Sequence, residues 1–395
     1  MVRSASPSAR ANPAPRLPGL DLLRALAIAW VMLYHASLFG LASQDVWVVR
    51  FGWLGVDLFF VLSGFLIAGQ LLRPWARGLA PNYPRFYGRR LLRTLPAYLV
   101  VVAVYFLAPV LRDRPDIQPL WQFLTFTQNL ALHPNPPKAF SHAWSLCVEE
   151  QFYLVFPAVV ALLSRRPSAT KVVACVAGVL LLGAALRGYS WLHDVAGTPF
   201  DISADPRGGR YMTVIYYPTW TRLDGLLAGI VAATIQTFRP QAWQALMGRA
   251  NLVLAAGVVG IGAAILFFHA QIATFWPTVF GFPLVSFSMA LVVMAASEPR
   301  SIVGRYAVPG AGALATGAYS LYLSHKLVFH AVQAVSGRLP PLAQRFELPL
   351  ALLAALVVGA ALYWLIERPF LKLRDRLEGP SRSSLAKAAP PIPQT

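Results

Sequence analysis

The chain has 395 residues, of which 57% are hydrophobic and only 13% are charged, and its mean hydropathy is +0.55. Soluble domains carry about 25% charged residues, so this composition excludes an ordinary soluble protein and indicates an all-α integral membrane protein. The net charge of +18 does not indicate nucleic-acid binding, because the basic residues lie mostly in short segments between apolar runs. Cys147 and Cys175 both lie in apolar runs and predict neither a disulfide framework nor a metal site.

Apolar windows of about 20 residues predict a bundle of about ten transmembrane helices. They lie near residues 20–40, 52–72, 96–111, 143–163, 172–192, 218–236, 252–269, 277–296, 313–333 and 348–366. Lys and Arg are enriched in alternate connecting segments, which predicts that both termini are cytoplasmic. We expect a disordered tail over 1–18, a transmembrane domain over 19–372 and a low-complexity cytoplasmic tail over 373–395.

The first predicted helix carries two polar residues on one face. Arg24 and His35 are eleven residues apart, which at about 100° per residue places them within about 20° of one face and roughly 16 Å apart along the axis. Charges inside a bilayer cost at least about 2.5 kcal/mol each, so a function is the first hypothesis. The alternative is an arginine that extends to the membrane surface and a histidine that bonds a neighbouring helix.

Acidic residues enter the bilayer in three other predicted helices. They are Asp57, Glu149, Glu150 and Asp224. Counting 1.5 Å per residue from the outer boundary places them at about the depth of His35. A carboxylate bonded to one imidazole nitrogen makes the other nitrogen a better general base. The alternative is a set of interhelical ion pairs, whose basic partners are Arg187, Arg222 and Lys326.

Arginines are concentrated in the segment 73–96, beside the second and third predicted helices. Those expected to hold phosphates are Arg85, Arg89, Arg90 and Arg93. Arginine binds phosphate in bidentate geometry, and the neighbouring tyrosines can stack on a nucleotide base. The alternative is an anchor that contacts anionic lipid. Membrane lipids are therefore expected partners in either case.

Several segments together form a pattern that extends from the first predicted helix to the last. They read GLDLLRALAIAWVMLYH, GVDLFFVLSGFLI, FYGRRLLRTLPAY, WSLCVEEQFYLVFP, RLDGLLAG, AYSLYLSH and ERPF. The chain resembles acyltransferase family 3, a family of integral-membrane O-acyltransferases. The resemblance implies transfer of an acyl group, in many members acetyl, from cytoplasmic acyl-CoA to a hydroxyl of a glycan, lipid-linked sugar or glycosylated metabolite. It implies the bacterial cytoplasmic (inner) membrane, and no fused extracytoplasmic domain is expected.

The residues and the resemblance together predict one mechanism. His35 is the expected general base, oriented by Glu149 or Glu150, and Arg24 holds CoA or polarises the thioester carbonyl. Direct transfer and an acyl-histidine intermediate both remain open. No metal is expected. Further polar residues expected to contact the substrate or support the site are Asp57, Ser63, Asp224, Tyr322 and His325. Ser63 lacks the strand–turn–helix setting of a hydrolase nucleophile and is interpreted as a packing residue.

A proton-coupled transporter or exporter is the alternative function. In that case the histidine and the intramembrane acids would form a proton relay. Transporters of this kind usually contain paired broken helices near the membrane midplane, and the sequence does not predict them.

Overall fold

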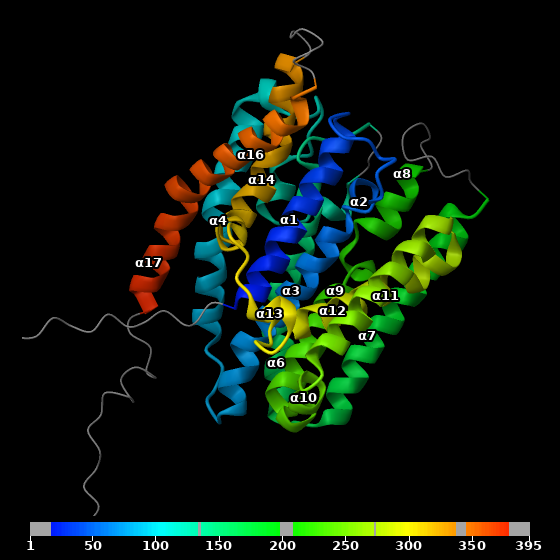
Figure 1. Cartoon of the computed structure of the whole chain (residues 1–395), viewed down its shortest axis with the longest axis vertical. Coiled ribbons are helices and arrows are strands. Elements are labelled where there is room, and N and C mark those ends of the chain that lie inside the picture. The colour runs from blue at the N-terminus through cyan, green and yellow to red at the C-terminus, as the bar shows by residue number, and fades with distance from the viewer. Residues whose placement is uncertain (1–16, 133–135, 198–207, 272–273, 337–344, 379–395) are drawn as a thin grey trace, which may run out of the picture.

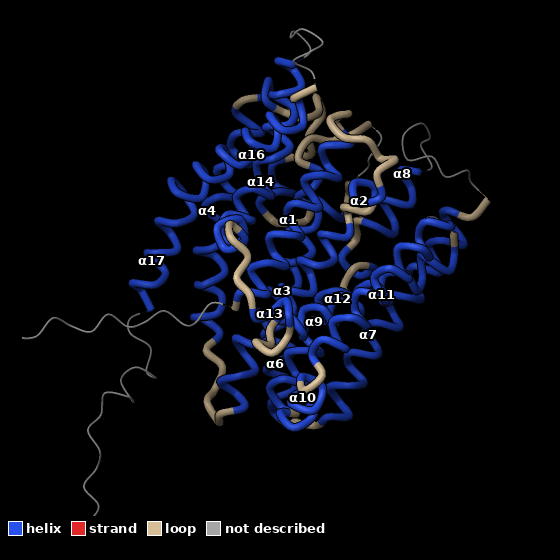
Figure 2. The backbone as a smooth tube through the Cα atoms, viewed as in Figure 1, coloured by secondary structure: helices blue, strands red, loops and turns tan. Residues whose placement is uncertain are grey.

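The computed structural model describes residues 17–132, 136–197, 208–271, 274–336 and 345–378, and the secondary structure of these residues is helical (Figures 1 and 2). The main helices are α1 (Pro18–Leu38), α3 (Leu54–Ala76), α4 (Tyr83–Leu107), α6 (Trp144–Arg165), α7 (Ala169–Ser190), α9 (Asp224–Phe238), α11 (Ala250–Gln271), α12 (Phe282–Ala296), α14 (Ala311–Ser336), α16 (Glu347–Leu362) and α17 (Arg368–Glu378).

Shorter helices connect them. The α-helical pieces are α2 (Trp47–Arg50), α5 (Leu120–Leu124), α8 (Gly208–Tyr211), α10 (Pro240–Met247) and α13 (Ile302–Arg305). The 3₁₀ and π turns are η1 (Pro109–Leu111), η2 (Gln128–Leu130), η3 (Ser141–Ala143), η4 (Trp191–Val195), η5 (Met212–Tyr216), η6 (Thr219–Thr221), η7 (Pro277–Gly281) and η8 (Tyr363–Glu367).

Within the described residues, eight segments are long and apolar enough to cross a membrane. They are Pro18–Leu38, Leu54–Ala76, Tyr83–Leu107, Ser141–Arg165, Ala169–Val195, Ala250–His269, Pro277–Ala296 and Glu347–Leu377. The chain is therefore a multi-pass membrane protein by length and composition. Each of the ten expected windows overlaps a helix, but α9 has only 15 residues. The count of ten spans and the cytoplasmic position of both termini stay predictions.

The expected terminal tails lie largely outside the described residues. Helix α1 begins at Pro18, and α17 continues to Glu378, into the segment expected to be the C-terminal tail. In Figure 1, α17 lies along α4 on one side of the molecule, while α7 and α11 lie on the other. Helix α1 lies between them and packs against α3 and α14.

Helix α4 begins earlier than the sequence analysis predicts. The expected helix covers 96–111, whereas α4 begins at Tyr83. The Asn82 side chain accepts a hydrogen bond from the backbone N–H of Arg85 (2.9 Å), and a proline in the first turn favours helix initiation. Arginine is also a good helix former. The arginine segment is therefore partly helical, and its side chains project at helical spacing.

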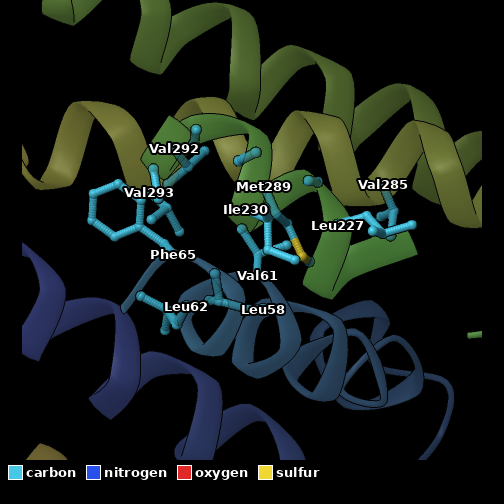
Figure 3. Close-up of a cluster of buried hydrophobic side chains, with 14 of the residues drawn as sticks. Leu58, Val61, Leu62, Phe65, Leu227, Ile230, Val285, Met289, Val292 and Val293 are labelled. Atoms are coloured by element: carbon cyan, nitrogen blue, oxygen red, sulfur yellow. The ribbon is translucent and has the colours of Figure 1, made fainter. Parts of the chain in front are cut away.

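Helices α3, α9 and α12 form the centre of the core. Their apolar side chains interlock in Figure 3, where Val61 of α3 faces Ile230 of α9 and Met289 of α12. Glycine permits the close approach of α3 and α9, because a Cβ at Gly229 would lie 2.2 Å from the carbonyl oxygen of Val61. Small residues at membrane helix interfaces allow such contact. This packing fixes the helices that carry the buried polar residues described below.

We expect Gly229→Ala to lower the thermal stability of the purified protein, because overpacking typically costs about 1–3 kcal/mol. Gly262→Ala is the matched control, since a Cβ there has no neighbouring atom within 4 Å. Its melting temperature in detergent should equal or exceed that of the unmodified protein. Equal melting temperatures for the two variants would contradict the close packing of α3 on α9.

Candidate functional site

Two cavities lie between the helices. The larger, which we call the arginine cavity, has a volume of about 550 Å³ and is lined by residues of α1, α3, α4, α6, α14 and α17. The smaller, which we call the histidine cavity, has a volume of about 90 Å³ and contains His35 in its wall. Val56 of α3 and Tyr322 of α14 line both cavities. The two cavities are therefore neighbours, separated by these two side chains.

The arginine cavity is strongly basic. Its walls contain Arg24, Arg73, Arg89, Arg90, Arg93 and Arg374. Two carboxyl side chains, Glu149 and Glu150 of α6, also line it. The Arg90 guanidinium lies 5.3 Å from the centre of the Tyr153 ring, a cation–π distance. Six guanidinium groups around one cavity form a site suited to a ligand with several phosphate groups.

The predicted phosphate-binding residues are only partly those that line this cavity. Arg89, Arg90 and Arg93 do so, but Arg85 is exposed and does not line it. The helical register explains the difference, because Arg85 lies in the first turn of α4. Two further arginines of this cavity were not predicted, Arg73 at the end of α3 and Arg374 on α17.

Arg24 lies at the arginine cavity, where it pairs with Asp21 at 3.0 Å. His35 lines the other cavity. The two residues of the polar face of α1 thus serve different cavities. Of the two roles expected for Arg24, contact with a phosphorylated ligand fits this position, whereas polarising a carbonyl beside His35 does not.

A chain of hydrogen bonds determines which nitrogen of His35 is protonated. Nδ1 of His35 lies 2.7 Å from Nε2 of His325, and Nδ1 of His325 lies 3.0 Å from the carbonyl oxygen of Leu321. A carbonyl only accepts, so His325 carries its proton on Nδ1 when neutral and its Nε2 accepts from Nδ1–H of His35. Nε2 of His35 is then the nitrogen with a lone pair, able to take a proton.

This arrangement differs from the expected one, in which Glu149 or Glu150 bonds the imidazole. Both glutamates lie at the arginine cavity, and the partner of His35 is His325. The depth estimate from residue counts was too coarse to decide between the two cavities. His325 was predicted as a polar residue of the site, without this contact.

Two of the intramembrane acids form buried ion pairs, as the alternative interpretation predicted. Arg222 donates to Asp57 at 2.8 Å, and Arg187 donates to Asp224 at 2.7 Å. All four side chains are at most 4% exposed. These carboxylates bind helix to helix and lie away from the walls of both cavities. Asp57 and Asp224 were expected to contact the substrate or to support the site, and their buried ion pairs favour the supporting role, which stays a prediction.

Tyr322 and Ser63 both line the arginine cavity. The Tyr322 hydroxyl donates to the carbonyl oxygen of His142 (2.9 Å) and lies 2.6 Å from the Ser145 hydroxyl. These contacts hold the tyrosine at the boundary between the cavities. The Ser63 hydroxyl is hydrogen bonded to the Tyr153 hydroxyl, which fits the prediction that Ser63 packs and does not act as a nucleophile.

The sequence analysis missed His142 entirely. Its ring is buried, lines the histidine cavity and lies with its centre 5.7 Å from the centre of the His35 ring. Neither ring nitrogen has a hydrogen-bond partner among the described residues. The signal in the sequence was its position two residues before WSLCVEEQFY, just outside the apolar window.

A fourth ion pair lies beside the histidine cavity. The Lys326 ammonium is 2.8 Å from a carboxylate oxygen of Asp113. Asp113 lies outside the candidate membrane spans. Burial alone would raise its pKa, but the Lys326 ammonium and the Phe140 N–H outweigh this and lower the pKa below its usual value. The pair therefore persists at neutral pH, and its contribution to stability is lost only as the pH falls through the lowered pKa.

Among the described residues, no group of three or more His, Cys, Asp or Glu side chains is arranged to hold a metal ion. The chemistry of the two cavities is that of a basic binding site next to a neutral imidazole.

Comparison of the sequence with known proteins identifies the class to which this membrane bundle belongs, which is that of the acyltransferase family 3 proteins. The model of the acyltransferase domain of acyltransferase family 3 matches residues 17–368, and the chain belongs to this family. Residues 17–368 thus form the acyltransferase domain that defines this family.

Two kinds of relative illustrate the similarity. The chain is 30% identical over 381 residues to O-acetyltransferase OatA of Staphylococcus aureus strain NCTC 8325. It is 28% identical over 373 residues to a putative O-acetyltransferase of strain COL. Each alignment covers 90% of this chain and 57% of the relative, so the chain spans little more than half the length of these proteins. No solved structure matches the chain.

We expect Asp224→Asn to destabilise the protein by about 3–5 kcal/mol, because it leaves the buried Arg187 guanidinium without its counter-ion. Asp116→Asn is the control, since it breaks the exposed pair with Lys138 and should cost less than about 1 kcal/mol. Thermal unfolding in detergent measures both. A smaller loss for the buried pair than for the exposed one would contradict the structural role.

Proposed function

We propose that the protein transfers an acetyl group from acetyl-CoA, bound in the arginine cavity, to an acceptor hydroxyl at the histidine cavity. The acceptor is a glycan, a lipid-linked sugar or a glycosylated metabolite, and the membrane is the bacterial cytoplasmic membrane, with the arginine cavity on its cytoplasmic side. The observation that carries this proposal is the hydrogen-bond chain from Leu321 through His325 to His35, which leaves Nε2 of a neutral His35 as the nitrogen that accepts a proton.

The donor binds through its phosphate groups. Three arginines of α4 line the arginine cavity, namely Arg89, Arg90 and Arg93. Arg93 is one helical turn from each of the other two. Arg24 joins them from α1. Guanidinium groups bind phosphate oxygens by paired, charge-assisted hydrogen bonds. With the phosphates there, the thioester extends past Val56 and Tyr322 toward His35, because these two residues border both cavities.

The chemical step uses Nε2 of His35. This nitrogen takes the proton of the acceptor hydroxyl as the oxygen forms a bond to the thioester carbonyl carbon, and an electron pair moves onto the carbonyl oxygen. When that pair returns, the carbon–sulfur bond breaks, and the CoA thiolate takes the proton from the imidazolium. The products are the O-acyl ester and the CoA thiol. The His325 contact holds the remaining proton on Nδ1, so that Nε2 stays the proton-accepting nitrogen.

The same nitrogen is the one that would form an acyl-histidine in the other expected route. A rapid burst of CoA thiol before ester appears would indicate that intermediate, and simultaneous formation of both products would indicate direct transfer.

The small volume of the histidine cavity favours a short acyl group. About 90 Å³ accommodates an acetyl group and a hydroxyl, but not a long acyl chain in addition. The relatives named O-acetyltransferase agree with this preference. These features support transfer of an acetyl group.

The alternative function, a proton-coupled transporter, requires a proton relay of intramembrane acids and His35. Two of the four acids proposed for it, Asp57 and Asp224, are held in buried ion pairs. Glu149 and Glu150 belong to the arginine cavity. Membership of the acyltransferase family favours the enzyme.

We expect His35→Ala to lower kcat by about 10²–10⁴-fold while the protein remains folded, because a general base is lost. His193→Ala, at an exposed position outside both cavities, is the control. Release of CoA thiol from acetyl-CoA, with methyl N-acetylglucosaminide as a model acceptor, measures the rate. A folded His35→Ala variant with the activity of the control would refute the base.

Neutralising Arg89 and Arg93 together, each to Gln, should raise the KM for acetyl-CoA at least about tenfold, because two charge-assisted phosphate contacts are lost. Added salt should weaken donor binding in the unmodified protein more than in the variant. Gln substitutions at the exposed Arg165 and Arg166 are the matched control. Equal KM values in the two double variants would indicate that the arginines of α4 anchor lipid and do not bind CoA.

A further inference from the structure

Lys326 is a buried cation in the wall of the histidine cavity. It follows His325 on α14 and is 6% exposed. Its ammonium lies 2.8 Å from Asp113 and donates to the Ser141 hydroxyl at 3.2 Å. An ammonium group has three donors, and these two contacts engage two of them. Since the side chain lines the cavity, the third donor is available to a ligand there.

Among the described residues that line the histidine cavity, Lys326 is the one lysine or arginine. Arg24 lies at the arginine cavity and pairs with Asp21. Arg222 is paired with Asp57 and lines neither cavity. Acyl transfer places a negative charge on the carbonyl oxygen, and a cation in a largely dry cavity stabilises such a charge strongly. Lys326 is therefore the residue positioned to do this.

The loop opposite α14 holds the ammonium in place. Asp113 also accepts the backbone N–H of Phe140 at 3.2 Å, so one carboxylate binds both Lys326 and the turn that presents Ser141. Phe140 has a left-handed backbone conformation with φ of 56°, which is costly for a residue with a side chain. Such conformations persist when surrounding contacts enforce them, and they often occur at functional sites.

We propose that Lys326 is a further catalytic residue, whose ammonium donates a hydrogen bond to the thioester carbonyl oxygen as it gains negative charge. Asp113 and Ser141 are its positioning residues. The proton stays on Lys326 throughout, while His35 carries the hydroxyl proton to the leaving thiolate. This inference rests on the proposed acyl transfer at His35, and it assigns to Lys326 the role of polarising the carbonyl.

The test compares Lys326→Gln with the unmodified protein, using acetyl-CoA and methyl N-acetylglucosaminide. We expect kcat to fall about 10²–10³-fold with little change in the KM for acetyl-CoA, because the lost contact forms only in the transition state. Lys326→Arg should recover part of the rate. Lys171→Gln, an exposed position at the start of α7, is the matched control and should keep full activity.

A purely structural role for Lys326 makes a different prediction, because Lys326→Gln leaves Asp113 buried without a counter-ion. The double variant Lys326→Gln/Asp113→Asn removes both charges, so it should fold while remaining slow. A second measurement uses an analogue of acetyl-CoA in which sulfur replaces the carbonyl oxygen. Sulfur is a poor hydrogen-bond acceptor, so the unmodified enzyme should have a higher kcat with the oxygen donor than with the sulfur donor. The ratio of these two kcat values should be at least about tenfold smaller in the folded double variant.

Two results separate this inference from the proposed function. In the first result, the unmodified protein transfers acetyl and His35→Ala does not, while the folded double variant keeps both its kcat and its preference for the oxygen donor. Lys326 is then not catalytic, and the inference is overturned. If the unmodified protein releases no CoA thiol above the level of His35→Ala, the proposed function itself fails.

Discussion

The site depends on one hydrogen bond between two helices, from Nδ1 of His35 on α1 to Nε2 of His325 on α14. Without it, the imidazole of His35 would be free to carry its proton on either nitrogen, and the Nε2–H tautomer could not act as a base at Nε2. The bond requires α1 and α14 to pack closely, which they do at the centre of the bundle. The carbonyl of Leu321 completes the arrangement from within α14.

The remaining polar groups of the site line two neighbouring cavities with different chemistry. Arginines collect around the larger one, which suits a phosphorylated donor, and histidines surround the smaller one, where the proposed chemistry occurs. The buried Arg222–Asp57 pair binds the segment just before α9 to α3, beside the close glycine contacts between these two helices. Structural and proposed catalytic charges thus lie within one membrane bundle but have different partners.

The sequence was sufficient for the family and the helical architecture, because apolar windows and spaced motifs are local signals. It also singled out His35, whose role stays a prediction. It was insufficient for the contacts of His35. Counting residues from a membrane boundary placed Glu149 near the histidine, whereas it lies at the arginine cavity. His142 and Lys326 were missed as site residues because each acquires its significance from a partner distant in sequence: Lys326 from Asp113, and His142 from the ring of His35.

The central claim is that one acyl donor occupies both cavities, with its phosphates among the arginines and its acyl end beside His35. The most direct test is a cryo-electron microscopy map of the protein with a ketone analogue of acetyl-CoA, in which a methylene group between sulfur and carbonyl prevents transfer. We predict phosphate density next to Arg89, Arg90 and Arg93, and the carbonyl beyond Val56 and Tyr322. Phosphate density elsewhere, or a carbonyl that stays in the arginine cavity, would contradict this account.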